Sequence, residues 1–144
     1  MGLPAQAGEW YSVDMDNKEL IQQAESLIRT RKNGDHTIGD VGAALVTDKG
    51  NVYLGVCIDT NSSMGFCAEH NAIGAMVTAG ESRINKIVAI WKNEKDEAQV
   101  LSPCGRCREF IFQIDNNNRD TEVILADKTI PLRELLPYRN WDTD

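Results

Sequence analysis

The sequence predicts a three-layer α/β domain whose central sheet is at least partly parallel. Apolar residues follow a helical period in some segments and form short continuous runs in others, in the order α-β-β-α-β-α-β-α. Strands joined through helices lie parallel in one sheet, with the helices packed on its faces. No internal repeat, low-complexity tract or linker interrupts the 144 residues. We therefore expect one domain over residues 16–144, preceded by an irregular leader over residues 1–15.

The first half of the chain predicts one helix and one hairpin. Apolar residues fall on one helical face between residues 18 and 30, and Asp16 or Asn17 is available as the N-cap. The Gly- and Asp-rich stretch 31–40 is expected to be a loop. The stretch "VGAALVTDKGNVYLGVCID" contains two apolar runs joined around residues 48–51, a pattern typical of a β-hairpin.

The second half alternates helices and strands. The segment "FCAEHNAIGAMVTAG" predicts a buried helix that ends at Gly80, and "INKIVAIW" predicts a central strand. A charged loop over residues 93–99 leads to "PCGRCREFIFQID", where the proline indicates the start of a helix. The segment "TEVILAD" predicts another strand, and "LRELL" predicts a short helix before the C-terminal tail.

Three of the four cysteines stand at predicted helix starts. Cys104 and Cys107 form a C-x-x-C pair directly after a proline, and Cys67 opens the preceding helix with Glu69 two residues later. A C-x-x-C pair alone is compatible with a redox pair, a structural zinc site or chance. A thioredoxin-like redox pair would follow the first strand of its βαβ unit, whereas this pair comes late in the chain. Helix N-termini favour thiolates, because the positive end of the helix dipole lowers the pKa of a thiol. Three thiolate ligands would leave one tetrahedral position of a zinc ion for water, as in catalytic sites.

The segments "VGAALVTDKGNVYLGV", "CAEHNAIGA" and "LSPCGRCRE" resemble the successive motifs of the cytidine deaminase family, in order and spacing, across roughly residues 18–139. The stretch "VLSPCGRCRE" followed by "LRELLP" is most similar to the blasticidin S deaminase branch. The resemblance implies an α/β/α sandwich with a mixed sheet of about five strands. It also implies a Zn²⁺ cofactor on Cys67, Cys104 and Cys107. The expected activity is hydrolytic deamination of a small aminopyrimidine nucleoside such as cytidine, deoxycytidine or blasticidin S, by a homotetramer.

By the same resemblance, Glu69 is the catalytic acid and base. It is expected to take a proton from water activated by zinc, and to deliver it to the ring nitrogen and then to the departing ammonia. Such a shuttle typically contributes about 10²–10⁴-fold to a rate. The backbones of Ala68, Ser102 and Cys104 are expected to orient the base and the leaving group.

Three thiolates around Zn²⁺ leave a net negative charge that neighbouring groups must offset. Many Cys-ligated relatives have an arginine directly after the catalytic Glu, where this chain has His70. We expect Arg106, inside the C-x-x-C pair, to offset the charge, with Arg108 as the next candidate and the helix dipoles assisting. His70 is expected to be a packed or surface histidine.

The sugar-binding positions depart from the family pattern. Cytidine-specific members carry Asn-x-Glu at the end of the second strand and a Phe two residues before "VGAA". The matching residues here are Cys57, Asp59 and Gly39. A thiol cannot replace an amide that both donates and accepts hydrogen bonds. We therefore expect Cys57 and Asp59 to contact the substrate and to favour a modified sugar or an aminated heterocycle without ribose.

Two further side chains have alternative roles. Cys57 is not expected to bind zinc, because a fourth thiolate would close the reactive position, and it is expected to be a buried thiol or part of the pocket floor. Trp141 lies where the blasticidin branch has an aromatic residue near the substrate. It either stacks on the substrate or packs the C-terminal tail.

The formal net charge of −7, from 15 basic and 22 acidic residues, argues against a nucleic acid polymer as partner, because no basic stripe is available to neutralise phosphates. A small or cationic ligand suits this charge better. No apolar run approaches the ~20 residues that cross a bilayer, so no membrane partner is expected. Four cysteines without a secretory signal indicate a reducing compartment, and the cytoplasm is the expected location.

Other functions fit parts of the pattern. The chain could deaminate another small aminated heterocycle, or hold structural zinc in a ligand-binding protein without turnover. Glu69 argues against a structural site, because such a site needs no acid two residues after a ligand. RNA-editing deaminases typically begin their motif with His-Ala-Glu and need a basic surface. Thiol-disulfide chemistry would require Cys104 and Cys107 to pair reversibly without a metal.

Overall fold

The structure of the protein, a computed structural model, describes residues 15–141. Its α-helices are α1 (Asn17–Ser26), α2 (Ala68–Thr78) and α3 (Gly105–Ile114). Two 3₁₀ helices follow α3, namely η1 (Asn116–Asp120) and η2 (Leu132–Leu135). The strands are β1 (Arg31–Asn33), β2 (His36–Thr47), β3 (Val52–Asp59), β4 (Ile84–Lys92), β5 (Ala98–Leu101), β6 (Glu122–Ile124) and β7 (Thr129–Pro131).

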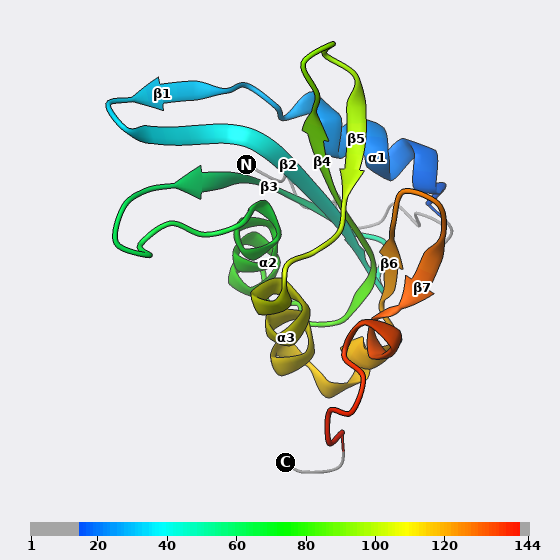
Figure 1. Cartoon of the computed structure of the whole chain (residues 1–144). Helices are drawn as coiled ribbons and strands as arrows, with labels where there is room; N and C mark the ends of the chain where they lie inside the picture. The colour runs from blue at the N-terminus through cyan, green and yellow to red at the C-terminus, as the bar shows by residue number, and fades with distance from the viewer. Residues whose placement is uncertain (1–14, 142–144) are drawn as a thin grey trace.

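These elements form three layers. Helix α1 covers one face of a mixed sheet, and α2 and α3 cover the other face (Figure 1). The predicted α/β/α architecture is therefore confirmed. The expected leader over residues 1–15, apart from Met15, lies outside the described residues, as does the C-terminal end of the expected domain.

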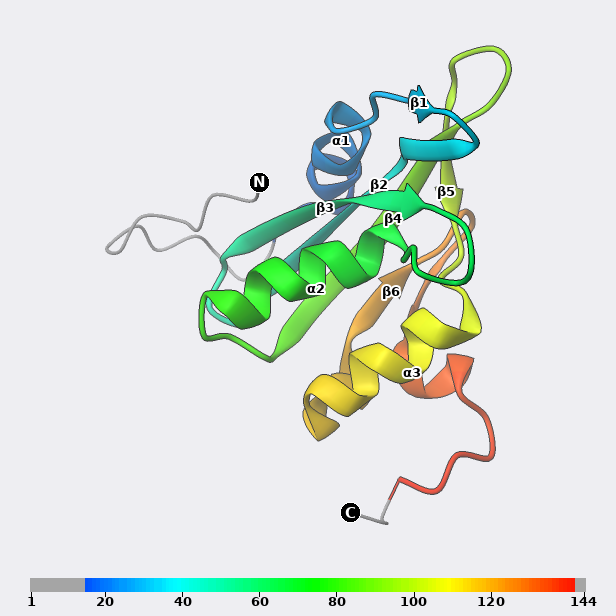
Figure 2. The same ribbon diagram turned by 90° about the vertical axis from the view of Figure 1, so that its left-hand side faces the viewer.

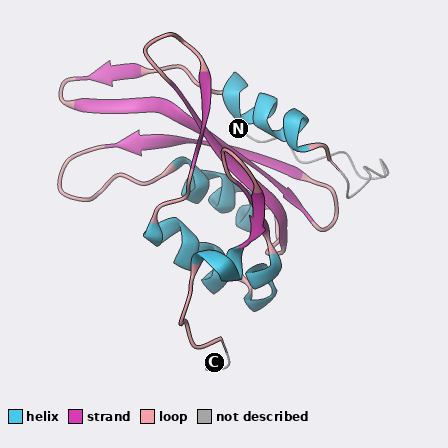
Figure 3. Ribbon diagram, turned by 45° about the vertical axis from the view of Figure 1, so that its right-hand side comes forward, coloured by secondary structure: helices cyan, strands magenta, loops and turns pink. Residues whose placement is uncertain are grey.

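The sheet has the strand order β1-β2-β4-β6-β7, with β3 paired to β2 and β5 paired to β4. Strands β2 and β3 form the predicted hairpin, and β4 pairs antiparallel with β2. Strand β6 pairs parallel with β4, with Lys86 opposite Glu122. The chain between these two parallel strands includes α3, as expected for a helical crossover (Figure 3).

The prediction of about five strands is wrong, because the sheet has seven strands within residues 15–141. The stretch 31–40, expected to be a loop, contains β1 and the start of β2, which pair around Gly34 at φ 61°. Part of the expected loop 93–99 belongs to β5, which pairs with the end of β4. Three of the strands, β1, β6 and β7, have only three residues each, too few for an alternating apolar pattern to stand out.

Two helix predictions also need correction. Helix α3 begins at Gly105 with Cys104 as its N-cap, so Pro103 precedes the helix instead of starting it. The segment "LRELL" is a 3₁₀ helix over Leu132–Leu135. The first correction matters for function, because it places the sulfur of Cys104 at the helix terminus.

The core has one part on each face of the sheet. Side chains alternate along β2, so Ala43 and Leu45 pack beneath α2 and α3 while Ala44 and Val46 pack beneath α1. Strand β4 alternates in the same way with Ile87 and Ala89 on one face and with Val88 and Ile90 on the other. The two middle strands are therefore buried on both faces, and this fixes the positions of the helices on either side.

Helix α2 lies unusually close to strand β3. A Cβ atom at Gly55 would come within 2.3 Å of the backbone nitrogen of Ala72, so only glycine fits at this crossing. Helices α2 and α3 run in the same direction, and their N-terminal ends lie at the same end of the molecule (Figure 2). That end holds the cysteines.

Candidate functional site

Three thiols meet where α2 and α3 begin. Cys67 is the N-cap of α2, Cys104 is the N-cap of α3, and Cys107 lies in the first turn of α3. The sulfur of Cys104 lies 3.6 Å from that of Cys67 and 3.5 Å from that of Cys107. All three sulfur atoms lie within 4.8 Å of one another. The structure therefore brings together the three cysteines that the sequence predicts as a metal site.

The geometry fits a tetrahedral zinc ion. Zinc–sulfur bonds of about 2.3 Å at tetrahedral angles separate two ligand sulfurs by roughly 3.8 Å. The two measured separations of 3.6 and 3.5 Å are close to this value. Within residues 15–141, these three cysteines are the only group of three or more His, Cys, Asp or Glu side chains placed to hold a metal. Three thiolates would bind zinc and leave its fourth position for a small ligand.

The three thiols differ in pKa, because burial and hydrogen bonds act on them unequally. Burial raises the pKa of Cys107 and that of Cys67. Burial also acts on Cys104, but hydrogen bonds from the Cys107 backbone N–H and from the neighbouring thiols outweigh it and lower the pKa of Cys104. Cys104 is thus the thiol that ionises most readily, and its thiolate is stabilised by the helix that it caps.

Glu69 lies in the first turn of α2 and is only 5% exposed. Burial raises its pKa, and this effect exceeds the opposing hydrogen bonds from its own backbone N–H and from Cys107. Its mostly apolar surroundings explain the burial: the carboxyl side chain shares a narrow pocket of about 10 Å³ with Ile87, Val88, Ala89, Leu101, Pro103, Val123 and Ile124. A carboxyl group of raised pKa beside a metal site is suited to hold and release a proton.

A cleft of about 340 Å³ opens beside the thiols. It is lined by Asp40 and Val41 in the first half of β2, by the end of β3, by the loop that leads to α2, and by Cys67 and Arg106. The predicted contact residues Cys57 and Asp59 both line it, and Asp59 is exposed. Its volume is at the lower end of the range of small-molecule sites.

Asp40 is a cleft residue that the sequence analysis does not identify. The pairing of β2 with β3 shifts between Ile38 and Gly42, and Gly39 has φ 81° within this irregularity. An irregularity of this kind redirects side chains, and here Asp40 reaches the cleft, where the Cys57 thiol donates a hydrogen bond of 2.6 Å to its Oδ1. Gly39 therefore has a conformational role where the family pattern has Phe.

The other predicted site residues lie as follows. Cys57 is outside the three-thiol cluster, and burial together with the Asp40 carboxylate raises its pKa. Ala68 is buried at the start of α2, and Ser102 is exposed just before Pro103. Trp141 packs edge-on against Phe112, with ring centroids 4.7 Å apart, and is absent from the residues that line the cleft. This position favours the tail-packing alternative for Trp141.

The charged groups near the thiols also differ in position. Arg106 lines the cleft, while Arg108 donates hydrogen bonds to the carbonyl oxygens of Pro103 and Leu135. His70 is half-buried, and its Nδ1 lies 3.3 Å from the sulfur of Cys107. Burial, followed by the nearby charge of Arg106, lowers the pKa of His70. The sequence analysis does not identify this contact between His70 and Cys107.

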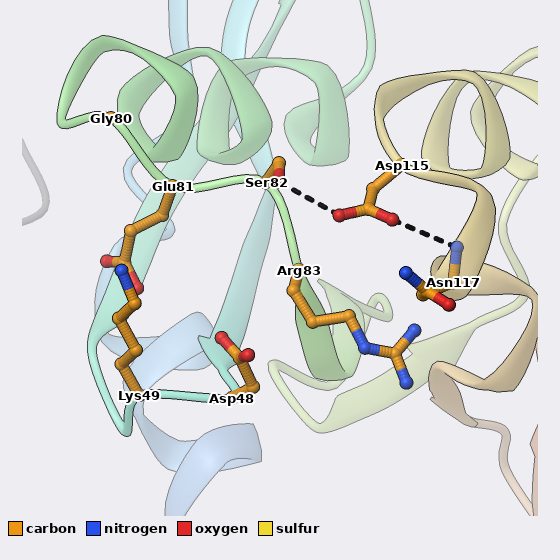
Figure 4. Close-up of a pocket in the computed structure, with 8 residues that line it drawn as sticks. All are labelled: Asp48, Lys49, Gly80, Glu81, Ser82, Arg83, Asp115 and Asn117. Atoms are coloured by element: carbon orange, nitrogen blue, oxygen red, sulfur yellow. Dashed lines mark hydrogen bonds between the residues drawn. The ribbon is translucent and has the colours of Figure 1, made fainter.

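A second cleft, also of about 340 Å³, lies at the opposite ends of the same two helices (Figure 4). It is lined by the β2–β3 turn, by residues 80–83 after α2 and by Asp115 and Asn117 after α3. The Asp115 carboxylate connects the segment after α3 with the segment after α2, because it accepts a hydrogen bond from the Ser82 hydroxyl. It also accepts one from the Asn117 backbone N–H, on its own side of the cleft. None of the predicted site residues lines it.

Three thiols at two helix N-termini, a buried acid beside them and an adjacent cleft are the arrangement expected of a catalytic zinc site, because a structural site needs neither the acid nor the cleft. The model of the cytidine and deoxycytidylate deaminase zinc-binding region matches residues 15–121. The chain therefore belongs to this family, and it is a zinc-dependent hydrolytic nucleoside deaminase.

Known relatives agree with this assignment. The chain is 33% identical to a blasticidin-S deaminase of Bacillus cereus over 107 residues, which cover 70% of this chain and 74% of the relative. It is 30% identical to a cytidine deaminase of Sporosarcina psychrophila over 105 residues, covering 72% and 74% of the two chains.

Solved structures share the fold. The cytidine deaminase of Mycobacterium leprae has a TM-score of 0.70 at 21% identity, over 86% of this chain and 99% of that one. The cytidine deaminase of Bacillus anthracis has a TM-score of 0.65 at 26% identity, over 85% and 84% of the two chains.

Proposed function

We propose that this enzyme deaminates a small cytidine-like aminopyrimidine nucleoside, such as cytidine, deoxycytidine or blasticidin S, and releases ammonia. The observation that carries the proposal is the almost complete burial of Glu69 beside a three-thiol cluster that opens on a ligand-sized cleft. A purely structural zinc site would need neither the buried acid nor the cleft.

Each residue has a distinct task in this proposal. Cys67, Cys104 and Cys107 hold zinc, which when bound makes water at its fourth position more acidic. Glu69 takes one proton from that water and passes it to the ring nitrogen next to the amino-bearing carbon, while the water oxygen bonds to that carbon. Glu69 then takes the second proton from the added hydroxyl and delivers it to the amino group, which leaves as ammonia when the carbon–nitrogen bond breaks. The raised pKa of Glu69 suits both directions of transfer, because the carboxyl group keeps the proton until the ring takes it. The backbones of Ala68, Ser102 and Cys104 orient the base and the leaving group.

The cleft favours a substrate with a modified or positively charged sugar. Two carboxylates, Asp40 and Asp59, line it, and a thiol stands where an amide would otherwise meet a ribose hydroxyl. Carboxylates accept hydrogen bonds from ammonium or guanidinium groups more strongly than from hydroxyls. The net charge of −7 also favours a positively charged substrate over a negatively charged one. Arg106, also in the cleft, offsets the negative charge of the thiolates and leaves the carboxylates for the substrate.

An ammonia-release assay tests the proposal. The wild-type enzyme and Glu69→Gln are compared on cytidine, deoxycytidine, blasticidin S, cytosine, adenosine and guanine, and zinc is measured in both proteins. We expect turnover of at least one pyrimidine nucleoside, and a decrease of at least about 10²-fold in Glu69→Gln with zinc and fold retained. Turnover of only a purine or a free base would support the alternative of another aminated heterocycle. Full activity in Glu69→Gln would remove Glu69 from the mechanism.

We further propose that the enzyme is a homotetramer in the cytoplasm. The large apolar side chains of Met64, in the loop that leads to α2, and Trp91, at the end of β4, are exposed in the single chain and would be buried if subunits met there. Over the described part of the chain, no helix has the length and apolar character needed to cross a membrane. Sedimentation velocity on the purified protein would show a four-chain species, and a monomer at micromolar concentration would contradict it.

A further inference from the structure

The thiol of Cys107 faces a histidine from the neighbouring helix. The Nδ1 atom of His70, in the first turns of α2, lies 3.3 Å from the sulfur of Cys107, in the first turn of α3. Sulfur is a large acceptor, and this separation is within hydrogen-bonding distance. Cys107 is completely buried, so water does not solvate its sulfur.

The imidazole ring is held in place from the same side. It stacks on the ring of Phe110 with centroids 4.3 Å apart and planes inclined by only 2°. Phe110 lies three residues after Cys107 on α3, so both side chains project from one face of that helix toward His70. The stack fixes the plane of the imidazole, whose Nδ1 lies 3.3 Å from the sulfur.

The other hydrogen-bond donors near Cys107 donate to other acceptors or lie on the cleft side. The backbone N–H of Cys107 donates to the sulfur of Cys104 at 3.4 Å, and Arg108 donates to two carbonyl oxygens. Arg106 is exposed on the cleft side. The Cys107 sulfur also contacts Cys104, which is itself a ligand, and Glu69, which is an acid. His70 is therefore the nitrogen donor placed to meet the negative charge of the buried Cys107 ligand directly.

We propose that His70 is a positioning residue that donates its Nδ1–H to the Cys107 thiolate and thereby sets the strength of the zinc site. Three thiolates give the zinc site a net charge of −1, and a hydrogen bond to one of them disperses this charge and stabilises the thiolate form that binds the metal. A thiolate carries no proton, so the zinc-loaded protein contains the Nδ1–H form of the His70 ring. This inference rests on zinc binding by the three cysteines and does not depend on which nucleoside is deaminated.

Two variants separate the hydrogen bond from the packing. His70→Phe keeps a ring that can stack on Phe110 but removes the donor. His70→Asn removes the ring and places an amide N–H close to the position of Nδ1. His36→Phe is the matched control, because His36 is the only other histidine of the chain and lies on β2.

Zinc affinity is measured by competition with a chelator, and the sulfur-to-metal charge-transfer band is recorded on the cobalt(II)-substituted proteins. We expect His70→Phe to bind zinc about 10–100-fold more weakly and to shift the band to longer wavelength, because the sulfur loses a hydrogen bond. His70→Asn should recover most of the affinity and of the band position, and His36→Phe should match the wild type. Wild-type affinity and band in His70→Phe would overturn the proposal, as would equal losses in both His70 variants.

A measurement on zinc-loaded protein with His70 intact covers the case in which His70→Phe fails to fold. In ¹⁵N-labelled His36→Phe, the imidazole signals come from His70 alone. We expect a protonated Nδ1. A protonated Nε2 with a bare Nδ1 would overturn the proposal. Neither result depends on turnover, so failure of this inference and failure of the proposed function are distinguishable.

Discussion

Glu69 and Asp59 are carboxylates at the same end of the molecule with opposite surroundings. Glu69 is buried beneath the thiols, where burial raises its pKa, while Asp59 is exposed at the cleft. The first environment suits a group that exchanges protons, and the second suits a group that recognises a charged or hydroxylated ligand. Both side chains are carboxylates, so the residue type does not distinguish the proton-exchanging group from the ligand-binding group. The difference in burial does.

The cysteines provide a test of the metal site with an internal control. Cys104→Ser should lose most of the bound zinc, because it removes one of three protein ligands, the one whose sulfur lies 3.6 and 3.5 Å from the other two. Cys57→Ser should keep its zinc, because Cys57 lies outside the cluster and bonds to Asp40. Elemental analysis of the two purified variants makes the comparison. Undiminished zinc in Cys104→Ser, or an equal loss in Cys57→Ser, would contradict the assignment of ligands.

The cleft residues should control substrate choice without changing the chemistry. In the double variant Cys57→Asn with Asp59→Glu, the new amide can donate to Asp40 as the thiol now does, and its oxygen remains to accept from a ribose hydroxyl. The longer carboxylate reaches further into the cleft. We expect kcat/KM for cytidine to rise relative to that for blasticidin S. Side-by-side kinetics on the two nucleosides decide the matter, and an unchanged ratio would remove these residues from the sugar site.

At the scale of elements, the position of α2 determines the site, because this helix carries both Cys67 and Glu69. Its position is set where it crosses β3, at a point without a side chain on the strand. A Cβ atom on Gly55 would lie 2.7 Å from the carbonyl oxygen of Ala68, the residue between Cys67 and Glu69. A change in the packing at this crossing would therefore move the metal ligand and the acid together.

Gly55→Ala should accordingly lower stability and weaken zinc binding together. The overlap is with backbone atoms of α2, which cannot rotate away, so we expect a loss of about 1–3 kcal/mol in the free energy of unfolding. Gly74→Ala is the matched control, because it lies on the exposed side of α2 with nothing within 4 Å of an added Cβ. That change should stabilise the helix by about 0.5–1 kcal/mol. Denaturant titrations with zinc measurements would test both, and equal effects of the two variants would show that the crossing is not tightly packed.

The sequence predicts those features whose signal is local. Three cysteines at helix starts identify the metal site, and the period of apolar residues gives the three helices and the main strands. Strands β1 and β7 have three residues each and β5 has four, so their pairing depends on partners elsewhere in the sheet. The contact between His70 and Cys107 joins positions 37 residues apart, and Asp40 reaches the cleft only because β2 is irregular at Gly39. The short strands, the contact between His70 and Cys107 and the position of Asp40 depend on residues that are distant in the sequence, so no local sequence pattern predicts them.

At the scale of the whole molecule, stability depends on polar links as well as on the two parts of the core. At the end away from the thiols, the carboxylate of Glu81, which follows α2, accepts hydrogen bonds from the Tyr53 hydroxyl at 2.5 Å and from the Asn51 amide at 2.9 Å. Tyr53 is only 2% exposed. These hydrogen bonds connect the residues that follow α2 to the β2–β3 hairpin. The ionisation of Glu81 and Tyr53 should therefore affect the free energy of unfolding of the whole domain.

The pKa values of the pair shift in opposite directions. Burial acts to raise the pKa of Glu81, but the hydrogen bonds from Tyr53, Thr47 and Asn51 outweigh it and lower that pKa. Burial, followed by the bond to Glu81, raises the pKa of Tyr53 to about 12. For Glu81 the unfolded chain binds the proton more tightly, so its contribution to stability is present above about pH 4.3 and is lost as pH falls. For Tyr53 the folded protein binds the proton more tightly, so its contribution is present below about pH 10 and is lost as pH rises toward 12.

Tyr53→Phe should therefore destabilise the protein most between about pH 5 and pH 9, where the hydroxyl is protonated and the carboxylate is ionised. We expect a decrease of about 1.5–3 kcal/mol in the free energy of unfolding in this range, as for a hydrogen bond to a charged group. The difference from the wild type should narrow as pH falls below about 4.3, and again above about pH 10. Tyr138→Phe is the control, because Tyr138 is fully exposed, and it should show no difference at any pH. Urea titrations of the three proteins across this range measure the effect. A difference that stays constant down to pH 3 would mean that the Tyr53 hydroxyl contributes through packing alone, independently of the charge on Glu81.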